Sequence, residues 1–354
     1  MKITDAIKVL RFPLAVLVVY IHYAPFQRVD LWALTAVDRP ITTTLYTLFS
    51  FLVGSVAVPI FVAISGYLYF IKIGNNFSRA QYIKQSRKRV YTLAIPYLGW
   101  IAITWIAGII YNLIKYDTTF TQLLSETWQN LYYILWAGPL YFPFYFIRDL
   151  IVLSLLAPLW HWLIKHTSWV WLVASLLLYF SPIELFTGLS TRLLFYYSLG
   201  AFFGIKGYKE LTISRPLGFI SILVTMVAAS VYIIKPVASA WHTPSLKLFE
   251  IALIVVLLFG LQGTDTTKPP FAWCKKMGIY SFFIYSTHQI YIINFARGFQ
   301  ERILTHFPAP LDDLLNVVTY ITFPLATVAI LVVAYKIWAK VAPRSLSLLL
   351  GGRI

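Results

Sequence analysis

Two ionisable side chains in the first apolar segment have the residue types and the spacing that chemistry inside a membrane requires. The segment Leu10–Tyr23 reads LRFPLAVLVVYIHY and contains Arg11 and His22, eleven residues apart. Eleven residues advance an α-helix by about 1100°, or three turns plus roughly 20°, so both side chains lie on one helix face, separated by ~16 Å along the axis. They cannot touch each other, but they can line one passage.

These two residue types suit a proton transfer next to a developing negative charge. A neutral imidazole near pH 7 can take a proton from a hydroxyl group, and a guanidinium in a low-dielectric site can stabilise an oxyanion. His22 is therefore our candidate general base, and Arg11 a candidate for stabilising the oxyanion or orienting a charged substrate. Two other interpretations stay open. Arg11 can act as an anchor at the cytoplasmic boundary, and His22 can be a hydrogen-bonded packing residue.

The composition predicts a membrane-spanning protein. Of the 354 residues, 59% are hydrophobic and 12% are charged, and the mean hydropathy is +0.74. Lipid cannot satisfy backbone N–H and C=O groups, and the apolar runs lack the alternation of a β-barrel, so the spans must be helices. The sequence thus predicts an all-α polytopic membrane protein with a single transmembrane domain over residues 1–354.

The apolar runs predict a bundle of about ten transmembrane helices. They cover residues 7–26, 46–71, 91–114, 139–164, 168–180, 192–205, 217–234, 246–261, 279–296 and 314–335. The fifth and sixth are shorter than the ~20 residues that a perpendicular span needs. The segment between them is therefore expected to be a wide loop or a re-entrant turn.

The charge distribution indicates sidedness. The formal net charge is +16, and most Lys and Arg residues fall in alternate connecting segments, on the side of the N-terminus. This pattern predicts that both termini are cytoplasmic. It also argues against a nucleic-acid-binding protein, which needs its basic residues on one folded surface. The six histidines and the single Cys274 show no spacing typical of a metal site, so we expect no metal.

Arg148, Asp149 and His288 are further ionisable residues within apolar segments. Arg148 and Asp149 fall in the fourth predicted span, where an unpaired charge at mid-depth costs about 3 kcal/mol. As sequence neighbours they point ~100° apart, so we expect them not to pair face to face and each to meet a different helix. They are either a structural ion-pair system or substrate-binding groups. His288, in the ninth span, is either a hydrogen-bonded packing residue or a further substrate-binding or catalytic group, ranked below His22.

Several segments, in order, resemble the membrane-bound acyltransferase-3 family. The first helix, RFPLAVLVVYIH, has the family's R-X10-H arrangement, and FVAISGYLYF at residues 61–70 is similar to its F-x-x-S-G segment. RKRVYTLAIPYLGW at residues 87–100 resembles the basic entry to the family's third helix. FYFIRDLIVLSLLAPLW and SFFIYSTHQI match later segments more loosely. The resemblance spans most of the chain.

The resemblance implies an O-acyltransferase of the cytoplasmic (inner) membrane, surrounded by membrane lipids. Such enzymes move an acyl group, usually acetyl, from a cytoplasmic donor such as acetyl-CoA to a hydroxyl of a surface polysaccharide or lipid-linked sugar. His22 and Arg11 then take the catalytic positions. Arg87, Lys88 and Arg89 would bind the phosphates of CoA, or act as ordinary cytoplasmic anchors. The acyl chain, the acceptor and the choice between direct transfer and an acyl-histidine intermediate stay open. The alternative function is a glycan or lipid transporter or flippase.

Overall fold

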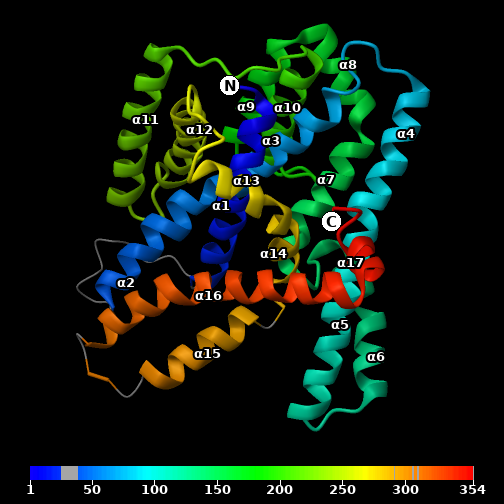
Figure 1. Ribbon diagram of the computed structural model, residues 1–354, viewed down its shortest axis with the longest axis vertical. Coiled ribbons are helices and arrows are strands. Elements are labelled where there is room, and N and C mark those ends of the chain that lie inside the picture. The colour runs from blue at the N-terminus through cyan, green and yellow to red at the C-terminus, as the bar shows by residue number, and fades with distance from the viewer. Residues whose placement is uncertain (25–38, 291, 305–306, 309–310, 354) are drawn as a thin grey trace. The chain divides into compact units, whose positions relative to one another are not determined.

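A computed structural model describes residues 1–24, 39–290, 292–304, 307–308 and 311–353 of the protein (Figure 1). Within these residues the regular elements are helices, and extended pairing is limited to two isolated bridges, Lys2 with Glu210 and Phe186 with Leu189. The predicted all-α class is confirmed.

The chain forms two compact units, and each is described by itself. The first comprises Met1–Phe61 and Tyr208–Tyr335, and the second comprises Val62–Gly207 and Lys336–Ile354. Of the three boundaries along the chain, two fall inside helices, α3 (Ala57–Phe70) and α16 (Leu311–Val341). The other helices of the first unit are α1 (Ile3–Tyr23), α2 (Pro40–Leu45), η2 (Tyr46–Val53), η3 (Gly54–Val56), α11 (Arg215–Ile234), α12 (His242–Leu261), α13 (Phe271–Met277), η7 (Gly278–Tyr280), α14 (Ser281–Thr287) and α15 (Ile292–Leu304). Those of the second unit are α4 (Arg79–Arg89), η4 (Val90–Ala94), α5 (Ile95–Lys115), α6 (Phe120–Gln129), η5 (Tyr133–Ala137), η6 (Phe142–Phe144), α7 (Tyr145–Leu155), α8 (Ala157–Thr167), α9 (Trp169–Phe180), α10 (Thr191–Ile205) and α17 (Pro343–Leu349).

In the first unit, α1 is enclosed by other helices. It contacts η2 and η3, which follow it closely in the sequence. It also contacts α13, η7, α14 and α15, which come from the last third of the chain. Ala15 and Val19 on α1 are fully buried. The neighbouring helices α11 and α12 pack against each other along their length (Figure 1). The apolar opening segment of the chain is therefore a central helix of its unit.

In the second unit, glycines allow α3 and α10 to approach at backbone distance. A Cβ placed at Gly200 would lie 1.9 Å from the carbonyl oxygen of Ala63, and one at Gly66 would lie 2.4 Å from that of Tyr197. With Gly204, Gly200 forms a G-x-x-x-G motif on α10, the small-residue spacing that favours close helix pairs in membranes. Gly66 thus serves helix packing.

We expect Gly200→Ala to destabilise the protein by about 1–3 kcal/mol, because the added methyl group collides with a backbone oxygen that cannot move without separating the two helices. Thermal unfolding in detergent micelles measures the effect. Gly260→Ala in α12 is the matched control, since a Cβ there meets nothing within 4 Å. Equal unfolding temperatures for the two variants would contradict the close packing of α3 and α10.

Five helical stretches in the described residues are long and apolar enough to cross a membrane, or six if one bent pair is counted as a span. The five are Pro40–Phe70, Arg79–Lys115, Arg215–Ile234, His242–Leu261 and Leu311–Val341. The protein is therefore a multi-pass membrane protein. The bent pair, Phe142–Leu155 with Ala157–Thr167, turns by 64°, so the single fourth helix predicted over residues 139–164 is wrong. Pro158, in the first turn of α8, explains the bend, because proline has no N–H for a helical hydrogen bond and its ring clashes with the carbonyl group four residues earlier.

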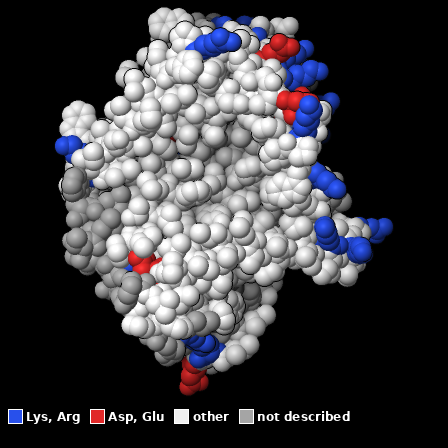
Figure 2. All heavy atoms as spheres, turned by 60° about the vertical axis from the view of Figure 1, so that its left-hand side comes forward, with Lys and Arg blue, Asp and Glu red and all other residues white. Residues whose placement is uncertain are grey.

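The exposed surface of the long helices is apolar. Phe219, Leu223 and Val227 follow each other at four-residue intervals along α11 and are 64%, 58% and 54% exposed. Such a stripe is unfavourable in water and suits contact with lipid. On the face drawn in Figure 2, wide areas of surface likewise have no charged side chain.

Candidate active site

His22 meets a second histidine inside the first unit. His22 is the penultimate residue of α1, and His288 directly follows the last residue of α14. Nε2 of His288 lies 3.1 Å from Nδ1 of His22, and the ring centroids are 4.9 Å apart. His288 has no exposed surface, whereas His22 is partly exposed. The two residues are 266 positions apart in the sequence, so only the tertiary fold pairs them.

The backbone changes direction next to this histidine pair. The prediction of one continuous ninth helix over residues 279–296 is wrong, because η7 and α14 end at Thr287, a turn follows at 288–290, and α15 begins at Ile292. No proline or glycine lies at the turn. Interrupted backbone at membrane depth is tolerated where it is enclosed by protein or lines a water-filled cavity.

The hydrogen bonds of the pair determine which nitrogens carry hydrogen. Nδ1 of His22 lies 2.8 Å from the carbonyl oxygen of Val18, and Nδ1 of His288 lies 3.0 Å from that of Ile284. A carbonyl oxygen only accepts hydrogen bonds, so each Nδ1 is a donor. In the neutral rings, both Nε2 atoms then carry the lone pair. Nε2 of His22 is thus the basic nitrogen, and the single Nδ1–H of His22 is shared between the carbonyl oxygen of Val18 and Nε2 of His288.

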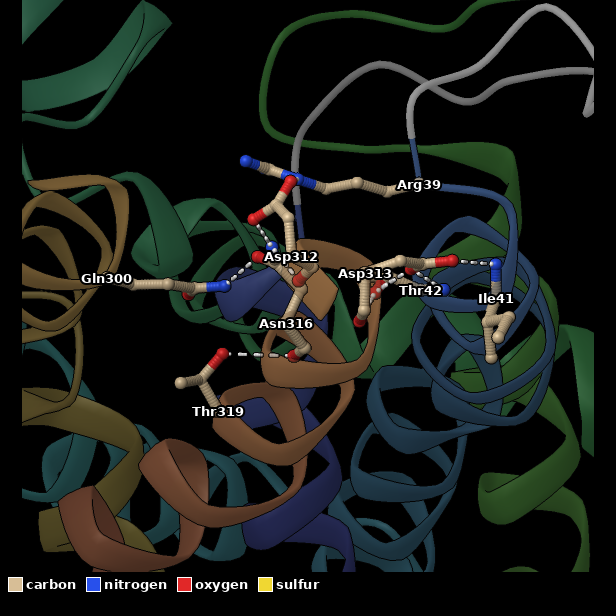
Figure 3. A network of polar contacts seen from close by, with 8 residues as sticks. All are labelled: Arg39, Ile41, Thr42, Gln300, Asp312, Asp313, Asn316 and Thr319. Atoms are coloured by element: carbon tan, nitrogen blue, oxygen red, sulfur yellow. Dashed lines mark hydrogen bonds and ion pairs between the residues drawn. The ribbon is translucent and has the colours of Figure 1, made fainter. Parts of the chain in front are cut away.

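The residue after His22 starts a chain of polar contacts. The hydroxyl of Tyr23 donates to Gln300 of α15, and the amide of Gln300 donates to Asn316 of α16. Asn316 in turn donates to the backbone and side-chain oxygens of Asp312, both at 2.9 Å, and Asp312 pairs with Arg39 at 2.6 Å (Figure 3). These contacts fix α15 and the start of α16 against the end of α1.

A second acid at the start of α16 positions α2. The two carboxylate oxygens of Asp313 accept from the backbone N–H groups of Ile41 and Thr42, at 2.8 and 2.9 Å, and one of them also accepts from the hydroxyl of Thr42 (Figure 3). A carboxylate at a helix N-terminus satisfies unpaired N–H groups and opposes the positive end of the helix dipole. Hydrogen bonds to Asp313 therefore hold the start of α2 against the start of α16.

Arg11 lies on the same continuous helix as His22, as the spacing predicts. Its side chain is partly exposed, and its Cβ faces Gly278 of η7, where an added Cβ would lie 3.9 Å away. The structure thus places Arg11 three helical turns from the histidine pair and not in contact with it.

The three predicted donor-binding cations differ from one another. All three end α4 in the second unit, but Arg87 and Lys88 are exposed, whereas Arg89 is partly buried. Arg89 donates to the carbonyl oxygen of Ser65 at 3.2 Å, and its guanidinium lies 5.2 Å from the ring centre of Tyr69. Arg89 therefore also fastens α4 to α3, a packing role that the sequence pattern did not reveal.

Arg148 and Asp149 pair directly with each other, so the prediction that these neighbours do not pair is wrong. Nη2 and Nε of Arg148 lie 2.8 and 3.0 Å from one carboxylate oxygen of Asp149. The arginine side chain is long enough to reach across the ~100° between adjacent positions. Each residue also contacts another segment, as predicted. Arg148 donates to the carbonyl oxygens of Trp136 and Ala137, and Asp149 accepts from the backbone N–H of Ser190 before α10.

Sequence reasoning missed several buried polar residues. Glu250, 2% exposed, lies in the apolar run of α12, and its charge inside that run was an available signal. Gln300 and Asn316 are also buried, but amides in partly polar helices give no comparable signal. Within the described ranges, no group of three or more His, Cys, Asp or Glu side chains is arranged to hold a metal ion.

The chain is similar to a protein family and to a characterised protein. A family model described as "Acyltransferase domain" matches residues 4–338. The chain is also similar to "Succinoglycan biosynthesis protein ExoH" of Rhizobium meliloti (strain 1021), with 26% identity over 312 residues, which cover 84% of this chain and 79% of the relative. No solved structure matches.

Proposed function

The chain belongs to the acyltransferase-3 family and is an acyltransferase, and from this premise we propose that it transfers an acyl group to a hydroxyl of a cell-surface polysaccharide or lipid-linked sugar. The donor is a cytoplasmic acyl-CoA, with acetyl as the first candidate acyl group. The relative that carries succinoglycan biosynthesis in its name supports a glycan acceptor. The membrane in question is the cytoplasmic (inner) one, because the donor is cytoplasmic.

The observation that carries the proposal is the 2.8 Å contact between Nδ1 of His22 and the carbonyl oxygen of Val18, from which the tautomer of His22 follows. The hydrogen bond from Nδ1–H to the carbonyl oxygen of Val18 leaves the lone pair on Nε2. A neutral imidazole with a defined basic nitrogen is what a general base for a weakly acidic hydroxyl needs.

The proposed reaction uses that nitrogen twice. Nε2 of His22 takes the hydroxyl proton while the sugar oxygen bonds to the thioester carbonyl carbon. The C–S bond then breaks, and the CoA thiolate leaves with the proton that Nε2 returns. The products are an ester and CoA–SH, and His22 is neutral again. An acyl-histidine intermediate would use the same nitrogen as a nucleophile.

The cations take supporting roles in this proposal. Arg11, on the face of α1 that His22 shares, orients the pantetheine or phosphate part of the donor, or stabilises the oxyanion if the thioester lies deep in the protein. Arg87 and Lys88, exposed at the end of α4, attract the phosphates, and Arg89 contributes positive charge beside them. The mutual pairing of Arg148 and Asp149 favours a structural role for them over acceptor binding.

The test is transfer by the purified protein. We expect the protein in lipid nanodiscs, given acetyl-CoA labelled in the acetyl group and an extracted glycan or lipid-linked sugar, to form a labelled base-labile ester. Free CoA–SH should appear in equal amount. Absence of transfer to every acceptor, together with no stabilisation of the protein by acyl-CoA, would contradict the proposal.

A further inference from the structure

Ser286, Thr287 and His288 follow one another at the end of α14. Among their described hydrogen bonds, the one of His288 reaches α1. The hydroxyls of Ser286 and Thr287 donate to carbonyl oxygens of their own helix, at 2.8 and 2.6 Å. The imidazole of His288 uses Nδ1 in the same way, but its Nε2 points to His22 at 3.1 Å. The break in the helix at 288–290 places this ring at the end of α1.

We propose that His288 is a positioning residue for the base, which accepts the hydrogen bond from Nδ1–H of His22 and stabilises the imidazolium that forms during acyl transfer. This inference rests on the proposed function. When Nε2 of His22 takes the acceptor's proton, both nitrogens of His22 carry hydrogen and the ring is positive. The bond from Nδ1–H to the lone pair of His288 then becomes charge-assisted and stronger. His288 stays neutral, and the proton stays on His22 until the thiolate takes it.

The environment explains why a histidine, and not an acid, suits this position. His288 is fully buried, and a carboxylate there would be charged throughout the cycle at a large desolvation cost. A neutral imidazole is a good acceptor without that cost. It also keeps its own orientation, because Nδ1–H is held by Ile284. Stabilisation is therefore greatest when His22 is charged, and this difference is what accelerates a reaction.

The experiment compares His288→Gln with His288→Leu in the nanodisc transfer assay. The Gln side chain can still present an acceptor oxygen to Nδ1–H of His22, whereas Leu fills the buried space without one. We expect kcat to fall by about 100-fold in His288→Leu and by no more than about 10-fold in His288→Gln, with the KM for acyl-CoA unchanged in both. The rates are compared at equal amounts of folded protein, and thermal unfolding of both variants measures their packing separately.

Rates measured at equal amounts of folded protein separate positioning from packing. If kcat falls equally in both variants, the inference is overturned. His161→Gln and His161→Leu are matched controls, since His161 is also buried and bonded to a backbone oxygen, that of Gly74 at 3.1 Å. They should change stability with little effect on kcat.

The same assay distinguishes the inference from the function on which it rests. A wild-type protein that transfers no acyl group contradicts the proposed function. Transfer that depends on His22 but is as fast in His288→Leu as in the wild type contradicts only the role of His288.

Discussion

Replacing His22 with alanine is expected to lower ester formation by about 10²- to 10⁴-fold, the usual contribution of a general base. The loss should appear in kcat, because proton removal belongs to the chemical step, and the KM for acyl-CoA should change little. The measurement is initial rate of labelled ester formation at equal amounts of folded protein. His166→Ala is a suitable control, because this histidine is exposed at the end of α8.

A second variant removes the ambiguity of misfolding. In His22→Asn, an amide N–H can take the place of Nδ1–H toward Val18 and His288, but no basic nitrogen remains. We therefore expect His22→Asn to be as inactive as His22→Ala and as stable as the wild type.

The same pair of variants decides between an enzyme and a transporter. A glycan or lipid flippase without chemistry would keep its cellular phenotype in His22→Asn, because the fold and its hydrogen bonds are retained. The enzyme would lose the acylated glycan at unchanged protein abundance. Full ester formation in the Asn variant would contradict the assignment of His22 as the base.

Replacing Arg148 with methionine is expected to lower the free energy of unfolding by about 3–5 kcal/mol. The change leaves Asp149, 1% exposed, without its cation, and removes the donor to the carbonyl oxygens of Trp136 and Ala137. Denaturant unfolding in mixed micelles measures the loss. The double variant Arg148→Met, Asp149→Asn should recover part of the stability, because no buried charge remains and the Asn side chain still has an oxygen for the N–H of Ser190.

An ion pair in the other unit provides the control. Arg39 and Asp312 are close in space, but their side chains are 36% and 14% exposed. Solvent screens such a pair, so Arg39→Met should cost about 1 kcal/mol or less. If Arg148→Met unfolds like the wild type but loses acyl transfer, the pair has a substrate-binding role and the structural interpretation is wrong.

The helical segments were predictable because helix formation depends on residues that are close in the sequence. Apolar runs of sufficient length have to satisfy their backbone internally, so α11, α12 and α5 lie close to where the hydropathy placed them. The bend at Pro158 also had a local signal, since proline acts on its own turn, but the predicted helix over residues 139–164 ran through it. The number of ten spans is not confirmed, because several runs form short or broken helices.

The sequence by itself determined that this is an all-helical membrane protein, that Arg11 and His22 share one helix, and that the motifs belong to the acyltransferase-3 family. Only the tertiary structure decided that His288 meets His22 and that Arg148 folds back onto Asp149. The physical reason is the range of the forces involved. Helix formation depends on neighbours within a few residues, whereas the partner of a buried polar group depends on which distant segments pack against it.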